Sequence, residues 1–193
     1  MTTSPLPAGD FSEWLIQFGR AADGDQDATV TCGTCTACCA SSQFVHVGPD
    51  ETDAIAHIPK TLLFPAPGLP TGYKLMGYDE HGRCPMLSDD GCSIYDHRPR
   101  TCRTYDCRVL PAAGLEIDPS AEPHKAAIAA QARRWRFTYS SKGDLAAHDA
   151  IRALARRTLA DKPSEAVTAV AVRAATAIAT PKSEVLVSRK RQK

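Results

Sequence analysis

The sequence predicts an α+β fold, in which a small, loop-rich cysteine domain with short strands is followed by an α-helical C-terminal extension. Three observations lead to this prediction. All eight cysteines lie between residues 32 and 107. Residues 59–72 are dense in proline and glycine, which is typical of a loop. After residue 119 the chain becomes rich in alanine and arginine, with the apolar spacing of helices.

The N-terminal segment predicts one amphipathic helix between irregular stretches. Residues 1–9 are polar and contain two prolines, so we expect disorder there. Apolar residues recur with helical spacing over residues 10–19, with Asp10 as the expected cap and Gly19 as the expected end. Residues 21–31 are an acidic loop.

The middle of the chain alternates short apolar runs with turn residues. We expect two strands to form a hairpin around residues 79–82, and a second turn at residues 89–91. The full set of expected elements is a strand at 43–47, a helix at 49–58, strands at 73–78 and 83–87, and a short helix from Pro99 to about Cys107.

The C-terminal part predicts three helices, at residues 123–137, 143–160 and 163–180, and a basic disordered tail. The predicted division of the chain is an N-terminal helix and acidic loop (1–31), a cysteine-cluster metal-binding domain (32–118), a helical extension (119–182) and the tail (183–193).

Charge and composition narrow the classes of function. The 23 basic and 22 acidic residues nearly balance, so the whole chain shows no general affinity for nucleic acid or membranes. Residues 121–193 do carry a local basic excess. We expect no secretory signal and no membrane span, and therefore a cytoplasmic protein. In that reducing compartment, dense thiols indicate metal ligands rather than disulfides.

The spacing of the cysteines predicts a metal centre. The Cys32-x2-Cys35-x2-Cys38-Cys39 run has the two-residue spacing that aims several thiolates at one metal or four-iron cluster. Adjacent side chains diverge, so the vicinal pair suggests two neighbouring metal positions or one multinuclear centre. Eight thiolates are enough for two four-cysteine sites, or for one cluster with cysteines to spare. The predicted ligands are Cys32, Cys35, Cys38, Cys39, Cys84, Cys92, Cys102 and Cys107.

Other side chains could assist the thiolates or share in ligation. Arginines near the cysteines would offset thiolate charge and donate hydrogen bonds to sulfur; they are Arg83, Arg98, Arg103 and Arg108. A lone histidine is more often a surface or core residue than a ligand, although His46, His57, His81 or His97 could complete a mixed site. His81 and His97 lie nearest the cysteines in sequence.

The same cysteines carry a resemblance to a known family. The first run is followed by Gly91-Cys92-Ser-Ile-Tyr95-x2-Arg98-Pro99-x2-Cys102-Arg103-x-Tyr105-x-Cys107. Together they closely resemble the CxxCxxCC cysteine-cluster family (YkgJ-like), a zinc- or iron-chelating domain, over about residues 30–110. The resemblance implies chelation by the cysteines, with Tyr95, Arg98, Pro99 and Arg103 around them. A similar cysteine region occurs in flagellin lysine N-methylases, so enzymes exist among the relatives.

Zinc and iron–sulfur ligation both suit pure thiolate donors. The repeated two-residue spacing, the Cys84-Pro85 pair and the surplus of cysteines favour an iron–sulfur cluster, while the short-spaced pairs and the absence of nicotinamide, flavin or S-adenosylmethionine motifs favour zinc. The balance favours iron, with zinc as the alternative.

Three functions remain open from the sequence. The favoured one is an iron–sulfur or zinc protein that transfers electrons or assists a partner enzyme. The second is a metal-dependent enzyme that modifies a protein or peptide, and the sequence leaves open whether the chain is an enzyme. The third is a zinc-stabilised interaction or nucleic-acid-binding module, which the basic helices alone support only weakly. We expect a protein partner and no nucleic acid or membrane, and the sequence does not predict the oligomeric state.

Overall fold

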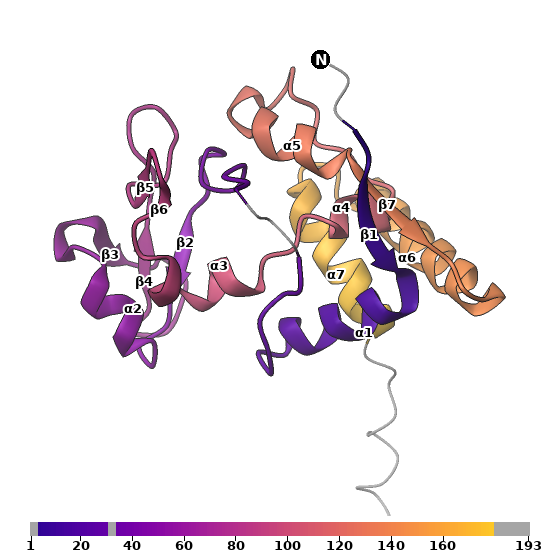
Figure 1. Ribbon diagram of the computed structural model, residues 1–193, viewed down its shortest axis with the longest axis horizontal. Coiled ribbons are helices and arrows are strands. Elements are labelled where there is room, and N and C mark those ends of the chain that lie inside the picture. Colours follow the sequence, from indigo (N-terminus) through magenta and orange to yellow (C-terminus); the bar gives the residue numbers. More distant parts are fainter. Residues whose placement is uncertain (1–3, 31–33, 180–193) are drawn as a thin grey trace, which may run out of the picture.

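A computed structural model describes residues 4–30 and 34–179 of the chain and shows two lobes (Figure 1). The sheet lobe (residues 45–97) contains short strands and one helix, and the helical lobe (residues 4–22 and 109–179) contains the longer helices. Helix α3 (Arg100–Thr104) lies between them. The mixed α+β fold with short strands and C-terminal helices is the one that the sequence predicts.

The helical lobe is built around helix α1 (Phe11–Ala22), α4 (Val109–Ala113), α6 (Lys142–Asp161) and α7 (Val167–Ala179). The predicted cap is present, because the Asp10 carboxylate accepts the N–H groups of Ser12 and Glu13. Phe11, Trp14 and Phe18 recur at helical spacing and are buried in this lobe's core.

Gly19 does not end α1, contrary to the prediction. The helix continues to Ala22. A Cβ atom at Gly19 would lie 3.0 Å from the Cβ of Ala179, so the glycine allows α7 to pack closely against α1. The residue is therefore needed for helix packing rather than for termination.

Two further predictions in this lobe are wrong. Part of residues 1–9 is ordered, since strand β1 (Leu6–Asp10) pairs in parallel with β7 (Trp135–Thr138). The expected helix at 123–137 is instead a 3₁₀ turn (Pro123–Lys125), helix α5 (Ala126–Ala132) and β7. Trp135 and Phe137 point into the core from β7, and this burial outweighs the helical propensity of the neighbouring alanines.

The sheet lobe contains two small antiparallel sheets. Strand β4 (Lys74–Met76) lies between β2 (Val45–Val47) and β3 (Leu63–Pro65), and β5 (Leu87–Ser88) pairs with β6 (Gly91–Cys92). The predicted turn at residues 79–82 is present, since the N–H of Gly82 donates to the Asp79 carbonyl at 3.0 Å and the N–H of Asp79 donates to the Arg83 carbonyl at 2.8 Å. The predicted pairing of the two flanking strands is wrong, because β4 pairs with earlier strands. The predicted turn at residues 89–91 does join β5 to β6.

The remaining elements of the sheet lobe pack on a small core of their own. The 3₁₀ turn Lys60–Leu62 precedes β3, and a second 3₁₀ turn, Tyr95–His97, follows β6. Helix α2 (Thr52–His57) confirms the predicted helix in shortened form and contributes Ala54 to the core. Buried residues of this core are Val45, Val47, Ala54, Ile58, Met76 and Ile94.

Among the described residues, no helix combines the length and the apolar character needed to cross a membrane. Helix α6, the longest, is capped by Ser141 and Asp144 and buries Ile151 and Ala155 against the rest of its lobe.

Candidate metal centre

The loop that carries the first cysteines is fixed at its C-terminal end by hydrogen bonds. The N–H of Cys84 donates to the carbonyl of Cys39 at 2.6 Å, which joins the loop to the second cysteine segment. The fully buried Ser41 hydroxyl donates to the Ala37 carbonyl at 2.6 Å and accepts the N–H of Ile128 at 3.2 Å. Ser41 thus attaches the loop to α5 in the helical lobe, since Ile128 lies in the first turn of that helix.

Five cysteines gather beside the core of the sheet lobe, and we call them the five-cysteine group. Three of them, Cys84, Cys92 and Cys102, pack against the buried core residues of this lobe. The members are half-buried and interact electrostatically with one another; they are Cys35, Cys39, Cys84, Cys92 and Cys102. The structure therefore brings together cysteines from the loop, from the segment before β5, from β6 and from α3.

The pKa values of this group are those of crowded, partly buried thiols. Burial, followed by the charges of Cys84, Cys92 and Cys35, raises the pKa of Cys39 from 9.0 to about 11. Burial also raises the pKa of Cys102 to about 12, with further increments from Cys84 and Cys39. Thiols that crowd each other in this way favour a shared cation, because a bound metal replaces their protons and removes their mutual repulsion.

Arg98 supplies positive charge to this group. Its guanidinium lowers the pKa of both Cys39 and Cys102, against the larger effect of burial. The guanidinium carbon lies 3.5 Å from the ring centroid of Tyr95, and its Nε donates to the Tyr95 carbonyl at 2.6 Å. Tyr95 thus positions the arginine, and Pro99, which is fully buried, starts α3 immediately after it.

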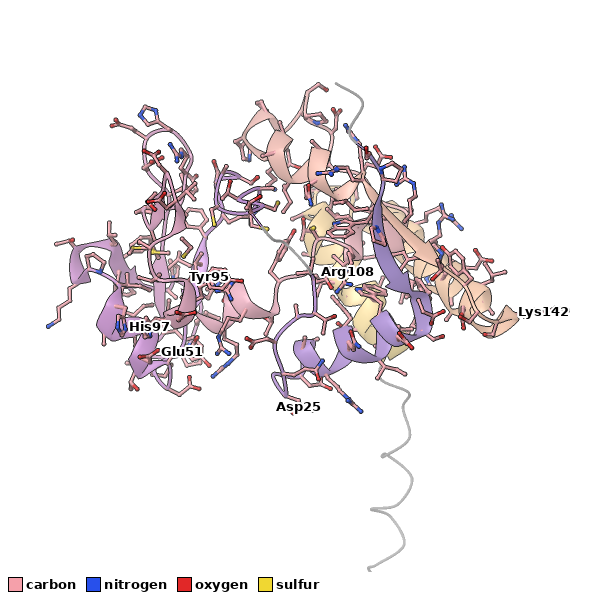
Figure 2. All side chains as sticks on the ribbon, viewed as in Figure 1. Asp25, Glu51, Tyr95, His97, Arg108 and Lys142 are labelled. Atoms are coloured by element: carbon pink, nitrogen blue, oxygen red, sulfur yellow. The ribbon has the colours of Figure 1, made fainter. Side chains whose placement is uncertain are left out.

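Arg103 and Arg108 bind other groups. Arg103 donates to the carbonyl of Arg98 at 3.1 Å and pairs with Asp27 at 2.6 Å, so it holds the acidic N-terminal loop against α3. Arg108, which Figure 2 labels, is buried and forms an ion pair with Asp106 at 2.7 Å. Its partner Asp106 also accepts the indole N–H of Trp14.

A second, smaller group of cysteines lies against the core of the helical lobe. Cys38 and the buried Cys107 pack there. Burial raises the pKa of the neighbouring Tyr105 well above its usual value, and the charges of Cys38 and Cys107 raise it further. The indole N–H of Trp135 donates to the sulfur of Cys107 at 3.1 Å. We call Cys38 and Cys107 the two-cysteine group.

The adjacent residues Cys38 and Cys39 therefore face different groups. Cys38 packs with the helical lobe, and Cys39 interacts with the cysteines of the sheet lobe. This is the divergence expected of neighbouring side chains, and it places the cysteine loop at the junction of the two lobes. The remaining predicted ligand, Cys32, lies outside the described residues.

The separation of the sulfurs bears on which metal the groups fit. A tetrahedral site with Zn–S bonds of about 2.3 Å requires sulfurs about 3.8 Å apart. In the described part of the chain, the potential ligands found within 4.8 Å of one another are Asp53, His57 and His97, and the group contains no cysteine. The donor chemistry of the five-cysteine group suits zinc and iron alike.

The histidines that the sequence places nearest the cysteines do not join them. The imidazole of His81 is exposed and lies 3.5 Å from Glu80. His97 pairs with Asp53 at 2.9 Å. Sequence reasoning missed Trp135 and Tyr105 as neighbours of the two-cysteine group. Tyr105 lies within the matched motif and was an available signal, whereas the approach of Trp135 depends on the β1–β7 pairing.

Comparison with known proteins identifies a family for the cysteine segment. No curated protein and no solved structure matches the chain. A family model matches residues 31–126, the segment that contains all the predicted ligands. Through residues 31–126 the chain belongs to the CxxCxxCC family, which is described as "Putative zinc- or iron-chelating domain".

Proposed function

We propose that the cysteines hold an iron–sulfur cluster, and that the protein transfers electrons or assists a partner enzyme through it. The observation that carries the proposal is the five-cysteine group, in which partly buried cysteines from several segments of the chain raise one another's pKa values. Its cysteines would be the ligands, and the cluster would supply one-electron chemistry.

The surroundings of the five-cysteine group support exchange with a partner. All five cysteines are only half-buried, and Tyr95 beside them is 55% exposed. A cluster close to the surface can exchange electrons with a docked protein, whereas a deeply buried one cannot do so as readily. Arg98 would stabilise the reduced, more negative form and so raise the reduction potential.

The two-cysteine group supports a second position for metal, or a structural role. Cys107 is buried and accepts a hydrogen bond from Trp135, the type of contact that tunes a thiolate ligand. With Cys32 from the preceding segment, these cysteines would complete the set of eight. Zinc at either position is the alternative to iron.

The deciding experiment is metal analysis and absorption spectroscopy of protein purified without oxygen. Iron and acid-labile sulfide with a broad absorbance near ~400 nm are expected of thiolate-bound clusters. A colourless protein with stoichiometric zinc would contradict the iron–sulfur proposal. A reversible change of this absorbance on reduction with dithionite would support electron transfer.

Paired variants test the assignment to groups. Cys39→Ser with Cys102→Ser removes two members of the five-cysteine group, and Cys38→Ser with Cys107→Ser removes the two-cysteine group. We expect the first pair to abolish the absorbance and the second to leave most of it. Equal loss in both would indicate one centre shared by all the cysteines.

A further inference from the structure

Three side chains on the surface of the sheet lobe form a cluster that the cysteine centre does not use. The Nδ1 atom of His97 lies 2.9 Å from Oδ2 of Asp53, and Nδ1 of His57 lies 3.6 Å from Oδ1 of the same carboxylate. The two imidazole rings are stacked, with centroids 3.5 Å apart and planes within 5°. One potential ligand atom from each residue falls within 4.8 Å of the others.

The backbone holds these residues in place independently of any ligand. Asp53 and His57 are one turn apart on α2, and His97 ends the 3₁₀ turn after β6. Between them the buried side chains of Ala54, Ile58 and Ile94 join the two elements through the core. Figure 2 shows His97 beside α2, near Glu51.

A second attachment fixes the start of α2 to α3. The Glu51 carboxylate accepts the N–H of Gly48 at 2.6 Å and also the N–H of Arg100. The Arg100 guanidinium pairs with Asp50. Helix α2, which carries Asp53 and His57, is therefore attached both to the 3₁₀ turn of His97 and to α3, which begins three residues after His97, and this lowers the entropy cost of binding an ion.

The chemistry of the cluster matches a transition-metal site. Two imidazoles and one carboxylate form the donor set of many zinc and non-haem iron(II) sites, with coordination positions left for water or a ligand. All three side chains are between 40% and 68% exposed, so an ion can reach them.

We propose that Asp53, His57 and His97 bind one divalent transition-metal ion, in a site separate from the cysteine centre. The ion would replace the hydrogen bond between His97 and the Asp53 carboxylate, and binding through Nδ1 of His57 would also replace the 2.9 Å contact of that atom with the Asp53 backbone carbonyl. An open cavity of about 520 Å³ adjoins His57 and is lined by α2 and by residues 58–60, which gives a ligand of the ion room beside it.

The test is a Co²⁺ titration of the full chain, because the spectrum identifies the donor atoms. Cobalt at the cysteines gives intense sulfur-to-metal charge-transfer bands, whereas cobalt on nitrogen and oxygen gives only weak visible bands. After the thiolate bands saturate, we expect one further equivalent that adds only the weak bands. The spectrum also tests the two proposals separately. If the cysteines bind no cobalt, only the charge-transfer bands will be missing, and the weak bands of the histidine site will remain.

Variants identify the ligands. The combined change His57→Asn and His97→Asn should remove the last equivalent and leave the charge-transfer bands unchanged. The matched control is His46→Asn with His81→Asn, two histidines of the same lobe outside the cluster, and it should retain the equivalent. A wild-type chain without the extra equivalent, or one that the double variant still binds, would overturn the proposal. Circular dichroism of the variants shows whether their fold is intact.

Discussion

At the scale of single residues, Arg98 has the clearest role around the cysteines. Its guanidinium lowers the pKa of Cys39 and Cys102, while the neighbouring Arg103 pairs with Asp27. The two arginines lie five positions apart in one motif, yet Arg98 stabilises thiolates and Arg103 stabilises the contact of the N-terminal loop with α3. Charge near thiolate ligands favours their metal-bound form, so only one of the two is expected to act on the centre directly.

The change Arg98→Gln is therefore expected to weaken metal binding about 10- to 100-fold, the usual cost of losing a partner that supports the ligands. Competition with a chromophoric chelator measures this affinity. Arg103→Gln is the control, and its effect should be several-fold smaller, since it breaks a contact to the N-terminal loop. Equal losses in the two variants would show that Arg98 acts only through general packing.

Asp144, on helix α6, makes a pH-dependent contribution to the stability of the fold. Its carboxylate accepts hydrogen bonds from the Ser141 and Ser12 hydroxyls, and from the N–H groups of Ser140 and Ser141. These bonds, the Ser141 hydroxyl first, lower its pKa from 3.8 to about 2. A depressed carboxylate pKa stabilises the fold above the unfolded value, and this stabilisation is lost as pH falls through the folded value.

We expect Asp144→Asn to lower the free energy of unfolding at pH 7, with the difference from wild type shrinking between about pH 4 and pH 2. Urea denaturation of the metal-free chain, followed by circular dichroism, measures it. Asp149→Asn, an exposed aspartate on the same helix, should show little change at any pH. A difference that stays constant down to pH 2 would contradict the ionised carboxylate as its origin.

At the scale of elements, local patterns could be predicted from the sequence and long-range pairings could not. The 3.6-residue period and the Asp10 cap predict α1 because both signals lie within one helix. The β1–β7 pair joins residues about 130 positions apart, and Trp135 and Phe137 follow an alanine-rich helical stretch. Strand formation there depends on burial in a core to which residues near both ends of the chain contribute. A short stretch of sequence therefore does not contain the residues that stabilise the strand.

The same limit applies to the candidate site. The cysteine spacing predicts ligands, because a two-residue spacing has a local meaning for metal binding. How the cysteines divide into a group of five and a group of two depends on which lobe each segment joins. The Asp53, His57 and His97 cluster joins residues 44 positions apart, so sequence reasoning considered the histidines but not the aspartate.

Gly9 tests the β1–β7 pair directly. It has φ of +93° at an irregularity in the pairing, and a Cβ atom there would meet nothing within 4 Å. Gly9→Ala should therefore destabilise the fold by about 1–2 kcal/mol through backbone strain alone. Gly9→Asn should cost less, since asparagine tolerates positive φ better. Thermal or urea unfolding gives both values, and equal stability of all three chains would mean that β1 contributes nothing.

At the scale of the whole molecule, the two lobes differ in how much core they possess. The helical lobe buries a large cluster that includes Phe11, Trp14, Ile128 and Trp135, whereas the buried cluster of the sheet lobe contains six residues. A core of that size cannot balance the conformational entropy of about fifty residues. Three cysteines of the five-cysteine group pack directly on it, so a bound metal would extend the core that this lobe lacks.

Removal of the metal is therefore expected to unfold the sheet lobe and spare the helical lobe, because metal-binding free energy acts as folding free energy where the apolar core is small. Hydrogen exchange of metal-loaded and chelator-treated protein measures this by segment. Amides of β2, β4 and α2 should lose protection, while those of α1, α6 and α7 keep most of it. The Cys39→Ser, Cys102→Ser variant without chelator should show the same pattern as the treated wild type. Uniform loss across both lobes would mean that they fold as one unit, and unchanged protection would mean that the cysteines do not stabilise the sheet lobe through a metal.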